Sequence, residues 1–129
     1  MAAWTADELE RIGTAEELNL QSLRGDGSLR DPVTMWVVRD GDDVYVRSVK
    51  GSQGPWFRGT RAQLAGHVRA GGVDKDVAFV DVADGADGGD LTPRVDAAYR
   101  AKYGRYPEDI FGSVVTPQAQ AATIRLVPR

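Results

Sequence analysis

The chain has 129 residues and a formal net charge of −3, with 42% hydrophobic and 27% charged residues, which is the composition of an ordinary globular domain long enough to bury a core. It has no cysteine, which excludes disulfides, thiolate nucleophiles and cysteine-ligated zinc, and its one histidine excludes an all-histidine metal site within one subunit. No apolar run approaches the roughly 20 residues that span a bilayer, and residues 1–13 lack the basic and apolar segments of a signal peptide. We therefore expect one cytoplasmic domain over residues 1–129, without a metal site or membrane contact.

The N-terminal region predicts a helix followed by a strand. In residues 5–13, Thr5 is suited to be the N-cap, Glu8 completes a capping box, and Gly13 ends the helix. Residues 16–24 then alternate between apolar and polar side chains, which predicts a strand, and "GDGS" supplies a turn.

The strongest hairpin signal is "PVTMWVVRDGDDVYVRSV". Two alternating segments, residues 33–38 and 44–49, are joined by the turn sequence "RDGDD". The first segment is apolar on both sides, as expected for a strand with core on each face.

Residues 58–72 predict a helix that is capped by Thr60, places Leu64 and Val68 on one face, and stops at a pair of glycines. A strand is expected over residues 76–84, and "GADGGD" after it reads as a loop. The carboxylates of that loop lack the spacing and the terminal glutamate of a calcium-binding loop.

The C-terminal third predicts a helix, a helical turn and a final strand. In residues 91–104, Thr92 is the expected cap, Pro93 takes the first helical position, and Val95 and Tyr99 follow on one stripe. "YPEDIFGSVV" adds the helical turn and "AATIRLVPR" the strand. Hairpin-linked strands with helices inserted later favour an antiparallel α+β domain, and five or six strands suit a small barrel.

Charge is distributed unevenly along the chain. Residues 44–73 contain no Asp or Glu, and their five cations are Arg47, Lys50, Arg58, Arg61 and Arg69. Since the chain carries −3 overall and this segment +5, the remaining residues carry −8. This predicts an electropositive face on an acidic body, which favours a small anionic ligand, because a nucleic-acid binder is normally basic as a whole.

The segment "YVRSVKGSQGPWFRG" lies inside this stretch and predicts an anion or cofactor site. Arg, Lys and Ser side chains donate charge-assisted hydrogen bonds to phosphate, glycines let backbone N–H groups approach it, and a tryptophan can stack on a planar heterocycle. The expected cofactor-binding residues are Arg47, Ser48, Lys50, Gly51, Ser52, Trp56 and Arg58. The alternative is a solvated strand, a simple turn and a core tryptophan, and neither a Walker loop nor a dinucleotide fingerprint is present.

Other residues allow two interpretations each. Arg58 and Arg61 would lie near the start of the predicted helix, where a bound anion would relieve their conflict with the helix dipole, or they are screened surface charges. His67 is either a general acid or a residue of the helix surface. Tyr99 and Tyr103, one helical turn apart, are either core residues or the candidate catalytic hydroxyls. Trp36 belongs to the core or to a pocket wall, and no nucleophile elbow indicates a hydrolase.

The stretch "LNLQSLRGDGSLRDPVTMWVVRDGDDVYVRSVKGSQGPW" resembles the flavin-binding split-barrel proteins of the pyridoxamine-phosphate-oxidase-like superfamily. "AYRAKYG" and "ATIRLVPR" are similar to an uncharacterised bacterial branch near the deazaflavin-dependent nitroreductase-like proteins. The resemblance implies a mostly antiparallel split β-barrel with flanking helices, a homodimer, and flavin mononucleotide (FMN) or a deazaflavin in a groove. It places the cofactor phosphate against Arg47, Ser48, Lys50 and Ser52. The chain lacks the Arg-x-x-x-Leu-Lys strand that supplies further phosphate contacts in the oxidases proper, and this departure argues against FMN as the cofactor.

These observations lead to two main hypotheses. The first is a protein that binds a phosphorylated flavin-like cofactor and acts as an oxidoreductase on a small organic substrate, with the ring beside Trp56 and Trp36 and a tyrosine facing the substrate. The second is a non-catalytic barrel module that binds another anionic metabolite or a protein partner. Single-stranded nucleic-acid binding has basic and aromatic residues in its favour, but the acidic balance of the chain argues against it.

Overall fold

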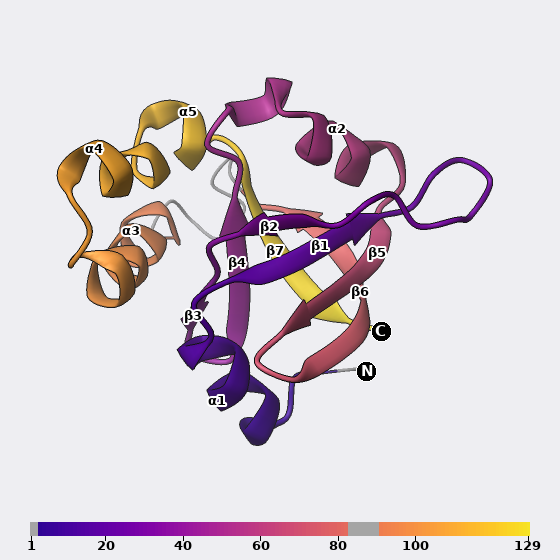
Figure 1. Ribbon diagram of the computed structural model, residues 1–129, viewed down its shortest axis with the longest axis horizontal. Coiled ribbons are helices and arrows are strands. Elements are labelled where there is room, and N and C mark those ends of the chain that lie inside the picture. The colour runs from indigo at the N-terminus through magenta and orange to yellow at the C-terminus, as the bar shows by residue number, and fades with distance from the viewer. Residues whose placement is uncertain (1–2, 83–90) are drawn as a thin grey trace.

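The computed structural model describes residues 3–82 and 91–129, apart from the side chain of residue 52. A curled antiparallel sheet of seven strands forms its centre, and helices lie around it (Figure 1). The strands are β1 (Leu18–Ser22), β2 (Val33–Met35), β3 (Val38–Asp40), β4 (Asp43–Arg47), β5 (Ala65–Ala70), β6 (Val73–Asp81) and β7 (Thr123–Pro128). The helices are α1 (Ala6–Thr14), η1 (Gly51–Gln53), α2 (Pro55–Ala62), α3 (Leu91–Tyr103), α4 (Glu108–Phe111), η2 (Gly112–Val114) and α5 (Pro117–Gln120). None of them combines the length and the apolar character that crossing a membrane requires.

The order of strands makes the sheet curl into a half-barrel. The order is β2-β1-β5-β6-β7-β4-β3, with every pair antiparallel, so β2 and β3 lie at opposite edges. Only Trp36 and Val37 separate these two strands along the chain. Because a chain spans at most about 3.6 Å per residue, the two edges must approach each other at this junction. The α+β class and the antiparallel sheet are confirmed, whereas the prediction of five or six strands was wrong. The hairpin segment contains one strand more than predicted, and residues 65–70, predicted as part of a helix, form β5.

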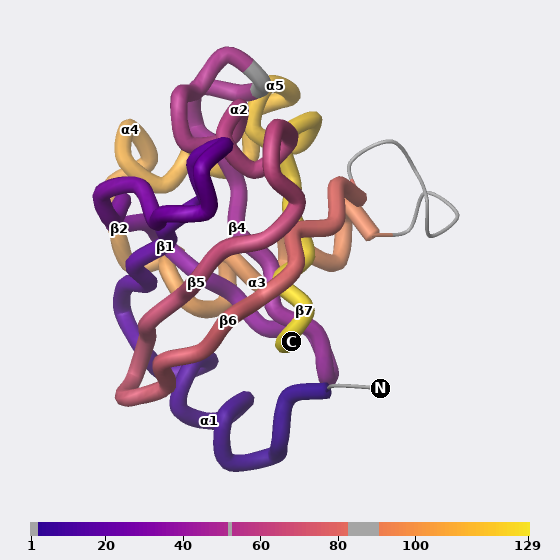
Figure 2. Tube along the Cα trace, turned by 90° about the vertical axis from the view of Figure 1, so that its right-hand side faces the viewer, coloured from indigo at the N-terminus to yellow at the C-terminus, as the bar shows by residue number. Residues whose placement is uncertain are grey.

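Two hydrophobic clusters occupy the two faces of β4. Val44 and Val46 belong to the cluster inside the half-barrel, while Tyr45 points to a second cluster beneath α3 that includes Val95 and Tyr99. Figures 1 and 2 show α1 and α2 at opposite ends of the half-barrel, and Figure 1 shows α3 and α4 beside β4. The wall of the barrel at β4 is therefore buried on both sides, as a strand flanked by two layers of core must be.

The N-terminal helix confirms its capping box. The N–H of Glu8 donates to the Thr5 hydroxyl at 3.1 Å, and the N–H of Thr5 donates to the Glu8 carboxylate at 2.9 Å. The helix continues to Thr14, one residue beyond the predicted glycine stop. The strand predicted next is β1, with Leu18 and Leu20 buried.

The hairpin prediction was correct about the turn and wrong about the first strand. β3 and β4 pair across a turn that contains Gly41, whose φ is +62°. The segment 33–38, however, breaks at Trp36, and its first half forms β2 against β1. The continuous apolar run therefore belongs to two edges of one curled sheet, which local alternation does not distinguish from one strand.

The helix predicted over residues 58–72 was also wrong. The chain forms α2 earlier, and Thr60 lies inside that helix, where its hydroxyl donates to the carbonyl of Phe57. Residues 65–70 form β5, which pairs with β1 on one side and β6 on the other. The two glycines, at φ +57° and +87°, form the β5–β6 turn rather than a helix stop.

The remaining elements are closer to the expectations. The strand predicted over residues 76–84 is β6, which begins three residues earlier, and the last strand is β7. α3 begins at Leu91, so Thr92 is not its cap, and the helical turn near residue 110 is α4 with η2. The "GADGGD" loop lies outside the described residues, and α5 was not predicted.

Gly66 in the centre of β5 provides a test of the packing. A Cβ at this position would collide with the carbonyl oxygen of Gln21 and lie 2.7 Å from the ring of Phe79. We expect Gly66→Ala to lower the free energy of unfolding by about 1–3 kcal/mol, measured by urea denaturation. Gly25→Ala is the matched control, because nothing lies within 4 Å of its Cβ position. Equal stability of the two variants would contradict this packing.

His67 lies on β5 between two carboxylates of β6, not on a helix surface. Its Nδ1 is 2.8 Å from Asp76, its Nε2 contacts Asp74, and Asp74 also accepts from Arg69. The hydrogen bonds to Asp76 and Asp74 raise the pKa of His67 above 6.5 despite partial burial.

Because the folded-state pKa is raised, protonated His67 contributes stability that is fully present below pH 6.5 and disappears as the pH rises through the folded-state pKa. We expect the stability difference between wild type and His67→Gln, at most about 1 kcal/mol, to be larger at pH 6 than at pH 9. Urea denaturation at the two pH values measures it. A difference that stays constant or grows with pH would contradict the assignment.

Candidate functional site

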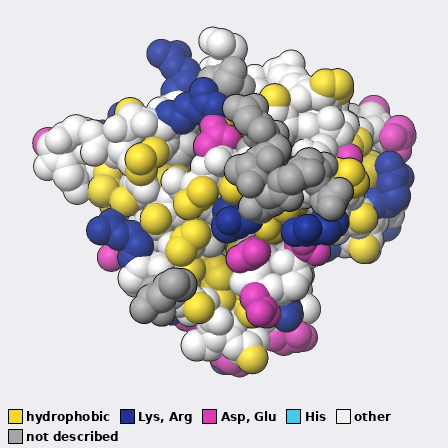
Figure 3. All heavy atoms as spheres, turned by 180° about the vertical axis from the view of Figure 1, so that it is seen from behind, with side chains coloured by type: hydrophobic (Ala, Val, Ile, Leu, Met, Phe, Trp, Pro, Cys, Tyr) yellow, Lys and Arg dark blue, Asp and Glu magenta, His cyan; other side chains and the backbone are white. Residues whose placement is uncertain are grey.

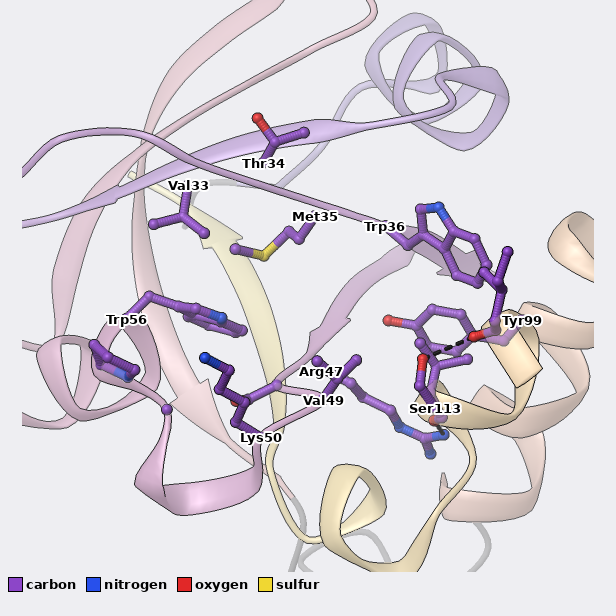
Figure 4. Close-up of a pocket in the computed structure, with 15 residues that line it drawn as sticks. Val33, Thr34, Met35, Trp36, Arg47, Val49, Lys50, Trp56, Tyr99 and Ser113 are labelled. Atoms are coloured by element: carbon purple, nitrogen blue, oxygen red, sulfur yellow. Dashed lines mark hydrogen bonds between the residues drawn. The ribbon is translucent and has the colours of Figure 1, made fainter. Parts of the chain in front are cut away.

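A cavity of about 540 Å³ opens where the β2–β3 junction, the end of β4 and the start of α2 meet the helical layer, which consists of α3, α4 and η2 (Figure 4). Its wall is mostly apolar and includes Met35, Trp36, Val49, Trp56 and Val114. Its volume lies within the range of small-molecule and cofactor sites. The cavity brings together residues from both halves of the chain.

Two buried hydroxyl groups border this cavity without a hydrogen-bond partner among the described residues, those of Ser48 and Tyr99. Ser48 is 1% exposed and Tyr99 0%. In Figure 4 the Tyr99 hydroxyl points toward the cavity below Trp36. Burial raises the pKa of Tyr99 far above its ordinary value, so this hydroxyl stays protonated and can donate a hydrogen bond. A buried polar group without a partner costs about 1–3 kcal/mol, and a ligand in the cavity would supply that partner.

Arg47 lies at the inner end of the cavity, but its guanidinium faces the helical layer. Its side chain is 0% exposed and forms an ion pair with Asp96 of α3. Nε donates to Thr123 at 3.0 Å, Nη1 donates to the carbonyl of Val114 at 2.9 Å, and Nη2 lies 3.4 Å from the carbonyl of Thr92. Four protein acceptors therefore already surround the cation that the sequence assigned to a phosphate.

The other cations of the acid-free segment separate into two groups. Arg61 pairs with Asp81 at 2.6 Å and Arg69 pairs with Asp74 at 2.9 Å, so acidic residues from β6 neutralise them. For Lys50 and Arg58, the part of the chain that the structure describes contains no ion-pair partner. Figure 3 shows basic and acidic side chains interspersed on the rear face. The predicted electropositive face is therefore reduced to a small region, because the sheet brings distant carboxylates to the arginines.

Lys50 borders the cavity, and Figure 4 shows its ammonium group extending toward Trp56. Arg58 is exposed on α2 and does not line the cavity. Arg61 lies in the last turn of α2, where the helix dipole favours a cation, so the expectation that it lies near a helix start was wrong. Lys50 is therefore the unpaired cation that lines the cavity.

The N-terminus of α2 forms part of the cavity wall. Gly54, its N-cap, and the first two helical residues, Pro55 and Trp56, all line the cavity. Among the described side chains none caps this helix, so the N–H groups of Trp56 and Phe57 in its first turn have no partner within the helix. A Cβ on Gly54 would lie 2.6 Å from the Ser48 hydroxyl, which places that hydroxyl directly against the helix start.

Gly51 serves the geometry of the turn. Its φ is +69°, its N–H donates to the carbonyl of Ser48 at 2.9 Å, and its α-carbon packs against Gln118. The amide that the sequence offered to an anion is therefore already used, and Gly51 does not line the cavity. The side chain of Ser52 lies outside the described residues.

Tyr103 lies behind the cavity wall. Its hydroxyl accepts from the N–H of Val37 at 3.2 Å and donates to the carbonyl of Glu16 at 2.8 Å. Its ring stacks on Trp36 with centroids 4.1 Å apart. Lys102 also donates to the Val37 carbonyl, at 2.8 Å, and burial lowers its pKa to about 8. Trp36 thus forms part of the cavity wall and packs against Tyr103 on its other side, whereas the hydrogen bonds of Tyr103 and Lys102 join the β2–β3 junction to α3.

Sequence reasoning missed Asp96, which lies one turn before Tyr99 on α3. Nothing in its local pattern distinguishes it from a solvated helix residue, and its contact with Arg47 joins positions 49 residues apart. Within the described ranges, no group of three His, Cys, Asp or Glu side chains is arranged to hold a metal ion.

Solved structures share this fold at low sequence identity. A Listeria innocua protein provisionally named a pyridoxamine 5′-phosphate oxidase matches with a TM-score of 0.64 and 16% identity, covering 94% of this chain and 90% of its own. A conserved hypothetical protein from Mycobacterium tuberculosis gives a TM-score of 0.62 and 12% identity over 99% and 82% of the two chains. An FAD-binding protein from Mesorhizobium loti gives 0.58 and 16% over 98% and 91%. At these identities the comparisons establish the fold alone.

No protein of curated function matches the chain. The predicted likeness to the pyridoxamine-phosphate-oxidase-like split barrels and to an uncharacterised bacterial branch is confirmed. Residues 8–126 match one family almost from end to end, and the chain therefore belongs to the family described as "Uncharacterized protein conserved in bacteria (DUF2255)".

Proposed function

We propose that the cavity beside Trp36 and Trp56 binds a phosphorylated flavin-like cofactor, FMN or a deazaflavin. The observation that carries this proposal is the pair of buried hydroxyls, Ser48 and Tyr99, which lack a partner among the described residues and border a mostly apolar cavity of about 540 Å³. A planar heterocycle with polar edges matches this combination, because its faces would lie against apolar walls and its edges would accept hydrogen bonds.

The residues present fit the ring better than they fit a phosphate at the inner end. Trp36 and Trp56 offer aromatic surface, and Tyr99 offers a protonated donor. Arg47, which the resemblance assigns to the phosphate, is occupied by Asp96. The FAD-binding protein of the same fold supports a flavin in such a barrel only by analogy.

A bound flavin or deazaflavin would supply hydride transfer, and the protein would supply orientation and electrostatics. Tyr99 would donate to an acceptor on the ring edge, and the apolar wall would exclude water from the ring. Arg47, Lys50 and Tyr99 are the ionisable residues among those that line the cavity. The chain itself therefore offers a hydrogen-bond donor and cations at the site, and oxidoreduction of a small organic substrate would depend on the bound group.

The second candidate is a module that binds the ligand without turnover. It is favoured because the residues that line the cavity include no carboxylate and no imidazole. The two candidates differ in reductant-dependent activity. The binding proposal itself is tested by titrating the purified protein with FMN and with an oxidised deazaflavin while the cofactor fluorescence is followed. We expect a saturable change in the micromolar range for at least one of them, and unchanged fluorescence for both would refute the proposal.

Tyr99→Phe separates binding from stability. We expect this variant to bind the cofactor about 2–10-fold more weakly, because a hydrogen bond to the ring is lost. The same substitution should leave the free protein as stable as wild type or more stable by up to about 1 kcal/mol, since it removes a buried hydroxyl that has no partner. Fluorescence titration and urea denaturation measure the two effects.

Tyr106→Phe is the matched control, because its hydroxyl bonds to Glu16 away from the cavity. It should leave the dissociation constant unchanged. Loss of affinity in both variants, or a large loss of stability in Tyr99→Phe, would show that Tyr99 does not act as a donor to the ligand.

A further inference from the structure

We propose that the cavity holds the anionic group of its ligand at the N-terminus of α2, between Lys50 and the Ser48 hydroxyl, and that Asp96 prevents Arg47 from serving as the anion contact. This inference rests on the proposed function and specifies which end of the cavity takes the phosphate. Of the phosphate contacts that the sequence predicts, it keeps Ser48 and Lys50 and excludes Arg47.

Protein acceptors take up most of the donors of Arg47. A guanidinium has five N–H donors, and four of them, on Nε, Nη1 and Nη2, are directed at Thr123, Asp96 and the carbonyls of Val114 and Thr92. Asp96 in turn accepts from Gln120 through its second oxygen at 2.9 Å. An anion placed beside Arg47 would therefore meet a neutralised pair and a nearby carboxylate, which makes the inner end of the cavity suited to uncharged groups.

The mouth of the cavity near α2 has the opposite character. Lys50 is exposed and has no ion-pair partner among the described residues, and it borders the cavity together with Gly54 and Trp56. The uncapped first turn of α2 presents free N–H groups and the positive end of the helix dipole.

The Ser48 hydroxyl is the independent sign that a ligand belongs here. It is buried, lacks a hydrogen-bond partner within the described part of the chain, and lies against the α-carbon of Gly54. A hydroxyl, an ammonium group and a backbone amide are donors that bind phosphate monoesters in proteins. The chemistry they share selects a small phosphate group, either free or as the tail of the cofactor.

FMN and riboflavin form the appropriate probe pair, because they share the ring and differ in the phosphate. We expect wild type to bind FMN about tenfold more tightly than riboflavin, which corresponds to one charge-assisted phosphate site. In Lys50→Met the two affinities should become equal within about twofold. Arg58→Met, which removes the same charge from an exposed position outside the cavity, should keep the wild-type preference. A preference for FMN that survives Lys50→Met overturns the proposal.

Asp96→Asn tests whether the Asp96 carboxylate keeps Arg47 from binding the phosphate, and here we expect a gain in affinity instead of a loss. Freed from its counter-charge, Arg47 should attract the phosphate, so the affinity for FMN should rise several-fold while that for riboflavin stays unchanged. An unchanged FMN affinity in a folded Asp96→Asn variant overturns the part of the proposal that concerns Asp96. If this variant does not fold, the comparison of Lys50→Met with Arg58→Met still decides where the phosphate lies.

Inorganic phosphate separates failure of this inference from failure of the proposed function. Millimolar phosphate should raise the melting temperature of wild type and Arg58→Met and leave that of Lys50→Met unchanged, relative to chloride at equal ionic strength. This result supports the anion site even when neither flavin binds, in which case only the cofactor proposal fails. An equal response of all three proteins, including no response, overturns the site.

Discussion

The ion pair between the buried Arg47 and the partly exposed Asp96 is the contact on which the arrangement of this end of the molecule depends. It joins the end of β4 to α3, and the same guanidinium reaches η2 through the Val114 carbonyl and β7 through Thr123. Removing one partner from a buried pair typically costs about 3–5 kcal/mol, because the other charge remains without compensation. The ion pair therefore fixes α3 and η2 against the sheet, and Tyr99 of α3 and Val114 of η2 line the cavity beside it.

A second set of contacts fixes the opposite wall of that space. The two edge strands of the half-barrel meet at Trp36 and Val37, where the chain leaves β2 and enters β3. Tyr103 binds both the N–H and the carbonyl of Val37 and stacks on Trp36, and Lys102 donates to the same carbonyl. Burial of Lys102 at this junction lowers its pKa to about 8. α3 thus contacts both walls of the cavity, β4 through Asp96 and the β2–β3 junction through Tyr103. The position of this one helix therefore sets the distance between the two walls.

The sequence predicted those elements whose signal is local. The capping box of Thr5 and Glu8 forms within one helical turn, and the β4 turn at Gly41 forms within four residues. The helix prediction for residues 65–70 was wrong because "AGHVRA" has a weak strand preference. These residues form a strand because they pair with β1, which is distant along the chain, and with β6, which follows them. The candidate site also combines features that a local pattern predicts with contacts between distant residues that it does not predict. The segment from Ser48 to Trp56 does border a cavity, but the ion pair of Arg47 joins residues 49 positions apart, and no local pattern contains it.

The proposed binding site rests on the unpaired hydroxyls. Three other buried hydroxyls of the described core have partners: Thr60 donates to Phe57, Thr123 donates to Gln120, and the Tyr103 hydroxyl bonds to two backbone segments. Ser48 and Tyr99 are as deeply buried as these residues, and both lack a partner where they border the cavity. In the proposed function, the bound molecule supplies the hydrogen-bond partners of these two hydroxyls, because a buried hydroxyl without a partner costs stability.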